Sequence, residues 1–310
     1  MPVKSIGKKV AGINAAVLLI LTVIAGLALS SQMSEYVIQG MELAVKCVIP
    51  SSFPFMIISD FYTHYGTPEK LGRIGKVFCK ILGISPNMIG ALICGNVGGF
   101  PIGAKMSAEL YATKCDKKCE YERLIPLSSN PSVAFIIGGV GLGMYQDVDI
   151  GFVLAASVYS SMLLCAIITR PKNINFDYID DNFKQKYSFV SSVKQSGSNC
   201  VSLIAFISIF SVAVGLIINH LNFGFLPYTI ITFLEVTNAL KLFASSADFV
   251  MPVKIALSGF SLGFGGISVM MQSAVFLEGT DLNLKKYVYI KLLQGILCGS
   301  ISTLLFLIFR

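Results

Sequence analysis

The chain has 310 residues, of which 54% are hydrophobic and 13% are charged, and its mean hydropathy is +0.73. The charged share is about half of that in soluble domains, which excludes an ordinary soluble protein and predicts an integral membrane protein. The net charge of +7 would indicate nucleic acid as a partner of a soluble protein. Here the basic residues gather in loops between apolar segments, so we expect a lipid bilayer and no nucleic acid as partner.

Apolar segments follow one another along the whole chain, and most are long enough to span a bilayer. The first follows Lys4, Lys8 and Lys9, but Ser30-Ser31-Gln32 is a poor cleavage site for a signal peptide, so we expect a retained helix. This pattern predicts an all-α, multi-pass membrane protein. The segments cover residues 10–30, 37–62, 82–108, 124–145, 149–169, 197–219, 225–245, 252–277 and 287–309.

The loops differ strongly in charge. Lys and Arg gather before the first segment and after the second, third and fifth, whereas residues 31–36, 146–149 and 219–224 contain neither. By the positive-inside rule, the N-terminus and the basic loops are cytoplasmic. Segment 82–108 has basic loops at both ends, which predicts a re-entrant helical hairpin that enters and leaves on the cytoplasmic face. The alternative is an ordinary full span beside one misplaced basic loop.

Two further segments carry breaks. Asn130-Pro131 interrupts segment 124–145, because proline lacks a backbone donor and disfavours helix in the residue before it. Glycines between 259 and 266 indicate a second re-entrant hairpin in segment 252–277. Broken helices at membrane depth are tolerated only where protein or a water-filled cavity satisfies the backbone, and they are common at transporter binding sites.

An internal repeat is indicated when residues 89–123 are laid over 254–288, since Gly98 then matches Gly263 and Asp116 matches Asp281. The prediction is one transporter domain, 1–310, built as an inverted repeat. Its halves cover about 37–145 and 197–310, and a helix with a cytoplasmic loop, 149–194, connects them.

Catalytic chemistry has no signature in this sequence. The eight cysteines mostly lie in apolar runs, and the two histidines form no cluster with them. We therefore predict no enzyme, no metal and no cofactor, with the coupling ion left open.

Five short motifs resemble, in order, the sporulation integral membrane protein YlbJ (SpoVV) family, which carries the Gate or nucleoside-recognition domain. The resemblance implies transport of dipicolinic acid across the outer forespore membrane of a sporulating bacterium. Residues 256–263 are also similar to a hairpin of concentrative nucleoside transporters, which implies two hairpins facing two unwound helices, with interfacial helices at 66–80 and 225–245. The motifs are Ile49-Pro50-Ser51-Ser52-Phe53-Pro54-Phe55, Gly98-Gly99-Phe100-Pro101-Ile102-Gly103-Ala104-Lys105, Ser128-Ser129-Asn130-Pro131-Ser132, Leu234-Glu235-Val236-Thr237-Asn238 and Phe264-Gly265-Gly266-Ile267-Ser268-Val269.

Candidate substrate-binding residues lie at the breaks, because the N-termini of half-helices offer partial positive charge and free amides to an anion. Lys105 is the expected cation, or else it extends to the cytoplasmic interface. Gln272 and Gln294 could donate to a carboxylate or bond between helices. The substrate-binding candidates are Asn96, Gly98, Gly99, Lys105, Ser129, Asn130, Ser132, Ser261, Gly265, Ser268 and Gln272.

An acidic residue in an apolar stretch marks a candidate coupling site. Glu235, with Thr237 and Asn238, could bind an ion or a proton. Glu235 could instead cap a surface helix or pair with Lys241.

The sequence thus predicts a membrane transporter of a small aromatic dicarboxylate. A nucleoside or another small metabolite is the alternative substrate, and a Gate-fold membrane scaffold is the alternative class. A homo-oligomer is left open.

Overall fold

The computed structural model describes residues 29–65, 73–113, 118–171, 188–220 and 224–310, and these residues form helices and no β-strand. The predicted segment 10–30 lies outside them except for its last two residues. Within the described residues, four helices are long and apolar enough to cross a membrane, and two bent pairs could each form one more span. The protein is therefore an all-α, multi-pass membrane protein, as predicted.

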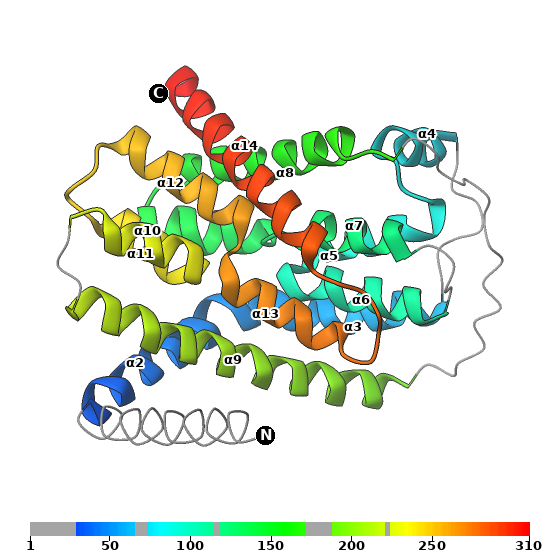
Figure 1. The fold of residues 1–310 in the computed structure, drawn as a ribbon, viewed down its shortest axis with the longest axis horizontal. Helices are drawn as coiled ribbons and strands as arrows, with labels where there is room; N and C mark the ends of the chain where they lie inside the picture. The colour runs from blue at the N-terminus through cyan, green and yellow to red at the C-terminus, as the bar shows by residue number, and fades with distance from the viewer. Residues whose placement is uncertain (1–28, 66–72, 114–117, 172–187, 221–223) are drawn as a thin grey trace, which may run out of the picture.

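The first half of the chain contains a bent helix, a hairpin, a broken helix and a straight helix, in that order (Figure 1). The short helix α4 comes before the hairpin, and residues 75–82 lie at 93° to residues 86–98. These elements are α2 (Ser30–Leu43), η1 (Ala44–Val48), α3 (Ile49–Tyr65), α4 (Arg73–Leu82), η2 (Pro86–Met88), α5 (Ile89–Gly98), α6 (Phe100–Thr113), α7 (Lys118–Ser128), η3 (Phe135–Tyr145) and α8 (Val148–Ile168).

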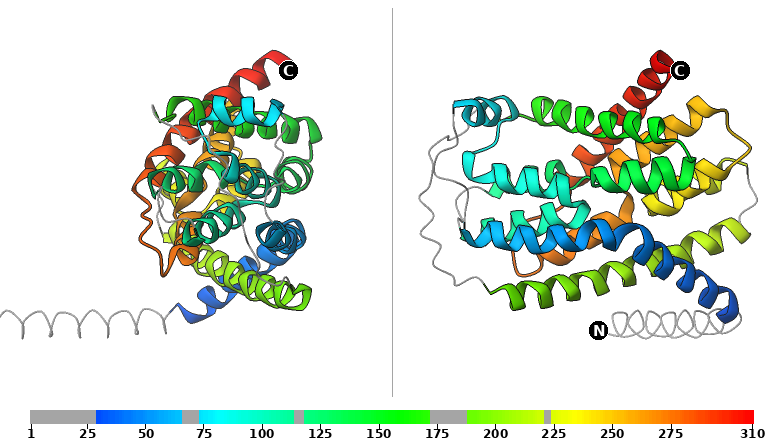
Figure 2. Two further views of the ribbon diagram at one scale, coloured as in Figure 1. Left: turned by 90° about the vertical axis from the view of Figure 1, so that its right-hand side faces the viewer. Right: turned by 180° about the vertical axis from the view of Figure 1, so that it is seen from behind.

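The second half repeats this order without a counterpart of α4: a long helix, a hairpin, a broken helix and a straight helix. Figure 1 shows that each of these elements runs opposite to its counterpart in the first half, and the view from behind in Figure 2 agrees. The elements are α9 (Phe189–His220), α10 (Leu226–Leu234), α11 (Val236–Ser245), α12 (Met251–Phe264), α13 (Gly266–Leu277) and α14 (Lys285–Phe309).

The first hairpin consists of α5 and α6 and turns at Gly99. The φ angle of Gly99 is +106°, in a region that favours glycine. A Cβ atom on Gly95 would lie 2.6 Å from the Cα atom of Gly103, so the two arms pack against each other at equal distances from the turn. Segment 82–108 therefore does contain a helical hairpin.

The second hairpin is not where the glycines indicated it. Residues 251–277 form a single candidate span that is broken, but not folded back, at Gly265 and Gly266. The chain folds back instead at Glu235, between α10 and α11. The ring of Tyr228 stacks on that of Phe243 with 6.4 Å between centroids, which brings the two arms together. Residues 225–245 therefore form two short helices that fold back on each other, and not the single helix that the similarity to nucleoside transporters implied.

The element order also changes the register of the repeat. Hairpin 89–113 corresponds to hairpin 226–245, and the broken helix 118–145 corresponds to 251–277. Helix α8 then corresponds to α14 and stands within the first half, where the sequence had indicated a connecting helix. The alignment of 89–123 with 254–288 matched glycines that have different roles, at a hairpin turn in the first segment and at a helix contact and a helix break in the second.

The two halves are tied together at the end where α6 finishes and α7 begins. The carboxylate of Asp281, between α13 and α14, accepts from the Tyr111 hydroxyl at 2.6 Å and from the Lys118 ammonium at 2.9 Å. These two donors lower the pKa of Asp281. The Asn283 side chain donates to Glu122 of α7 at 2.6 Å. These hydrogen bonds thus join the end of α6 and the start of α7 to the segment that leads into α14.

Helices α12 and α14 pack closely through small residues. A Cβ atom on Gly263 would lie 2.8 Å from the carbonyl oxygen of Gln294 and 2.9 Å from the Cα atom of Gly295. Such glycines let helix backbones approach each other in membranes. The glycine pattern of 259–266 therefore reflects helix packing and a helix break, and not a hairpin.

We predict that Gly263→Ala lowers the thermal midpoint of the purified protein, because overpacking a close backbone contact costs about 1–3 kcal/mol. Gly197→Ala in α9 is the matched control, since a Cβ atom there meets nothing within 4 Å. Alanine is favoured over glycine in a helix by about 1 kcal/mol, so the control should keep or raise the midpoint. Equal midpoints for the two variants would contradict the packing argument.

We predict that the first hairpin is re-entrant, with both ends on one side of the membrane. Proteins that keep only the native Cys119, or only a cysteine from Lys80→Cys, should react with an impermeant thiol reagent from the same side. Ala247→Cys, exposed between α11 and α12, should react from the opposite side. Labelling of positions 80 and 119 from opposite sides would make segment 82–108 a full span.

Candidate functional site

A pocket lies at the centre of the protein, where the two hairpin tips meet the two helix breaks. Gly99 and Phe100 come from the first tip and Glu235 from the second, while Pro131 follows the break after α7. Val269 lies in the first turns of α13, after the Gly265-Gly266 break. Both halves of the chain therefore contribute walls to one site.

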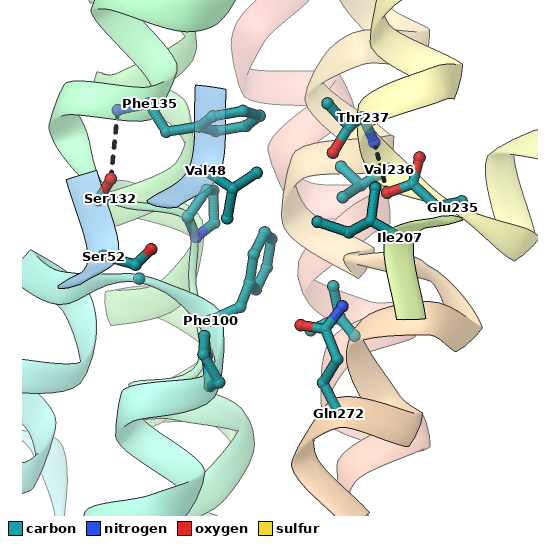
Figure 3. A pocket seen from close by; sticks show the side chains of 14 residues that line it. Val48, Ser52, Phe100, Ser132, Phe135, Ile207, Glu235, Val236, Thr237 and Gln272 are labelled. Carbon is teal, nitrogen blue, oxygen red and sulfur yellow. Dashed lines mark hydrogen bonds between the residues drawn. The ribbon is translucent and has the colours of Figure 1, made fainter. Parts of the chain in front are cut away.

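The pocket has aromatic rings on one side, beside Ser52 and Ser132, and the side chains of Glu235 and Gln272 on the other, beside Ile207 and Val236. Figure 3 shows the rings of Phe100 and Phe135 on one side, facing Glu235 and Gln272 on the other. The amide of Gln272 points across the pocket toward Phe100. A flat apolar surface opposite hydrogen-bonding groups suits a planar ligand with polar substituents.

Four helices begin at this pocket: α6, the segment that leads into η3, α11 and α13. The first amides of a helix lack partners within it and carry partial positive charge. Ser132 accepts from the amide of Phe135 at 3.2 Å, but no side chain caps the start of α13. The backbone thus supplies positive potential to the site without a charged side chain.

Glu235 is 1% exposed and caps the start of α11. Its carboxylate accepts from the amides of Thr237 at 3.0 Å and Asn238 at 2.6 Å, and from the Asn238 side chain at 2.8 Å. The sequence offered either a coupling site or a cap on a surface helix. The structure shows a cap, but one that is buried and lines the pocket.

A polar network lies directly behind the Phe100 wall. The Asn130 amide donates to Asn96 Oδ1 at 2.8 Å, and Asn130 Oδ1 accepts from Gln294 at 2.7 Å and from Lys291 at 2.9 Å. The hydroxyl of Tyr159 lies 2.9 Å from the Asn96 carbonyl oxygen and 3.0 Å from that of Pro131. The network thus joins the first hairpin, the helix break and α14.

Lys291 supplies the positive charge of this network. Its ammonium is fully buried and also donates to Ser129 O at 3.0 Å and Gln294 Oε1 at 2.9 Å. A lysine near the bilayer centre costs about 2.5–3.5 kcal/mol on insertion scales. Each hydrogen bond to a charged group contributes about 1.5–3 kcal/mol, so three such bonds can offset that cost.

Lys105 does not supply the cation of the pocket. Its ammonium pairs with the carboxylate of Asp60 on α3, which also accepts from Ser192 of α9 at 2.8 Å. The buried pair anchors the second arm of the first hairpin to two long helices. This salt bridge neutralises Lys105, and Lys105 does not line the pocket. The prediction that Lys105 is the substrate-binding cation is therefore corrected.

The remaining predicted residues fall into three groups. Gly99, Ser132, Gln272, Glu235 and Thr237 line the pocket. Asn96, Ser129 and Asn130 belong to the network behind it. The third group surrounds these: Asn238 bonds to Glu235 and Ser211, Gly265 lies against the Phe100 ring, Gly98 packs on Phe55 and Ile102, and Ser261 and Ser268 have buried hydroxyls without a described partner.

Sequence reasoning missed several residues of the site. Phe100, Phe135, Val48 and Ile207 line the pocket, but apolar residues in apolar segments give no signal. Lys291 did give a signal in the sequence, because it is a lysine inside the apolar segment 287–309. Ionisable residues within spans are functional candidates by default, and that rule would have found it.

A comparison with known proteins bears on the identity of this site. The chain is 26% identical over 309 residues to the "Sporulation integral membrane protein YlbJ" of Bacillus subtilis (strain 168), covering 86% of this chain and 76% of that protein. This similarity agrees with the resemblance to the YlbJ family that the sequence motifs indicated. No family model matches the chain, and no solved structure matches it.

We predict that Asn130→Ala strongly destabilises the protein. The change leaves Lys291, Gln294 and Asn96 each short of a buried partner, and each unsatisfied group costs about 1–3 kcal/mol. Asn199→Ala in α9 is the matched control, because the Asn199 amide nitrogen is buried without a described partner. Thermal midpoints and monodisperse yields in detergent should fall for Asn130→Ala only. Similar values for both variants would show that the network is not essential for stability.

Proposed function

We propose that this protein is a membrane transporter of a small aromatic dicarboxylate, with dipicolinate as the first candidate. One observation carries the proposal: two hairpin tips and two helix breaks, from oppositely running halves, converge on a single pocket at the centre of the molecule. Transporters commonly place broken helices at the interface of inverted repeats, where the substrate binds.

The chemistry of the pocket supports an aromatic anion. Phe100 and Phe135 offer flat surfaces to a ring, and Gln272 and Ser132 offer donors beside them. Helix starts and the buried Lys291 favour negative charge at the Phe100 wall. A dicarboxylate must lose most of its hydration in such a site, so several fixed donors are needed to replace the water.

The pocket is small. Its volume is about 40 Å³, which is room for about three water molecules and too little for an aromatic dicarboxylate. The walls come from separate elements, the first hairpin and the Asn130-Pro131 break on one side and α11 and α13 on the other. Movement of one half against the other would open the site, as alternating access requires.

Glu235 gives the proposal a coupling site. A carboxylate beside a bound dianion is repulsive unless a proton or a cation accompanies the substrate. Glu235, Thr237 and Asn238 stand together at the second hairpin tip, where the amides of Thr237 and Asn238 donate to the Glu235 carboxylate. We propose that the substrate enters with a proton or a small cation at this tip.

Glu235 also favours a second candidate substrate, a nucleoside. A buried carboxylate and an amide can read the hydroxyl and N–H groups of a neutral polar ligand. In either case we propose that the protein is a carrier without enzyme activity or cofactor. The name of its relative supports a role in sporulation, and we propose the outer forespore membrane as its place of action.

We predict that proteoliposomes containing this protein take up dipicolinate, and that pyridine dicarboxylate isomers compete while uridine and adenosine do not. Gln272→Ala should lower uptake by about tenfold, because one hydrogen bond to a charged group is lost. Gln195→Ala, an exposed position on α9, should transport at the parental rate. Competition by nucleosides alone would promote the second candidate, and the absence of uptake for both classes would favour a membrane scaffold.

A further inference from the structure

The hydrogen bonds around Lys291 favour its charged form. Its Nζ atom has three oxygen neighbours: Ser129 O at 3.0 Å, Asn130 Oδ1 at 2.9 Å and Gln294 Oε1 at 2.9 Å. An ammonium group has three donors and no acceptor. A neutral amine would turn its lone pair toward one of these oxygens.

The neighbouring amides are fixed in orientation. The Asn130 nitrogen donates to Asn96 Oδ1 at 2.8 Å and to Leu127 O at 3.0 Å, while its oxygen accepts from Gln294 at 2.7 Å. A rotated Asn130 amide would bring two donors together on one side and two acceptors together on the other. In this network Lys291 meets three acceptors, an arrangement that suits the ammonium form.

This charge lies one layer behind the pocket. The Nζ atom is 6.0 Å from the centroid of the Phe100 ring, which lies on the aromatic side of the pocket. Asn130, its hydrogen-bond partner, is followed by Pro131, which also lines the pocket. A ligand cannot reach the ammonium without displacing the ring, but charge acts over such distances where little water screens it.

No other buried charge that the structure describes near the site lies close enough to Lys291 to neutralise it. Lys105 is paired with Asp60, away from the pocket. Glu235 lies on the opposite wall, where the amides of α11 hold its carboxylate. The pocket thus has a positive side behind Phe100 and a negative side at the second hairpin tip.

We propose that Lys291 determines the charge specificity of the pocket, favouring a carboxylate of the ligand at the Phe100 wall without touching it. This inference rests on the proposed binding of substrate in this pocket. It differs from a purely structural role for Lys291 as a donor to the Ser129 carbonyl just after α7, because such a role would affect stability without changing which ligands bind.

The test compares two ligands that share one ring, pyridine-2,6-dicarboxylate and the uncharged pyridine-2,6-dicarboxamide. Their dissociation constants are measured with the purified full-length protein by ligand-dependent thermal stabilisation. The parental protein should prefer the dicarboxylate, and Lys291→Gln should lose that preference by about tenfold while its affinity for the diamide changes little. Lys285→Gln, the same change at an exposed position of the same helix, should keep the parental preference.

A second variant keeps the inference testable if Lys291→Gln does not fold. Gln294→Glu places a carboxylate beside the ammonium, so it cancels the charge and keeps the lysine, and it also removes the donor to Asn130 Oδ1. It should also reduce the preference for the dicarboxylate, whereas Lys291→Arg should preserve it. The parental preference should persist in high salt, because a buried charge is screened less than a surface charge.

Several results would overturn the inference. These are an unchanged ligand preference in Lys291→Gln or in Gln294→Glu, a parental protein that prefers the diamide, and a parental protein that binds neither ligand. Failure of the transport proposal would look different. Lysine-dependent binding of the dicarboxylate without uptake would reject transport alone, and uptake with the same charge preference in Lys291→Gln would reject this inference alone.

Discussion

The bond between the Lys291 ammonium and the broken helix after α7 is the contact on which the centre of the protein depends. The helix ends at Ser128, and the backbone that follows lies where no lipid could satisfy it. Lys291 and Asn130 supply partners from α14 and from the break itself. Because α14 belongs to the second half, the break in one half is stable only when the other half is packed against it.

This arrangement explains how an apolar chain can carry a polar site at its centre. The interrupted helices and the hairpins leave backbone amides unpaired within their own elements. Glu235 and Ser132 satisfy some of them at the pocket. A site built in this way offers positive potential from helix starts, and it needs few charged side chains, which are costly in a membrane.

The buried charges have different partners and therefore different uses. Lys105 and Asp60 pair with each other and hold the first hairpin against α3 and α9. Lys291 bonds to neutral oxygens and Glu235 to amides and an amide side chain, so these bonds pair neither group with an opposite charge. The first pair fixes a position, while the other two groups are the basis of the charge asymmetry that we propose for the pocket.

The sequence by itself determined the membrane class, the apolar segments, the first hairpin and the break at Asn130-Pro131, because hydropathy, loop charge and proline act locally. It also placed Gly99, Ser132, Glu235, Thr237 and Gln272 among the site residues, and these line the pocket. Only the tertiary structure decided that the second hairpin turns at Glu235 and that the glycines near 263 serve packing on α14. It alone decided that Asp60 neutralises Lys105, while Lys291 faces neutral oxygens. Ion pairing and helix packing join residues far apart in the chain, and a local pattern cannot reveal which of them meet.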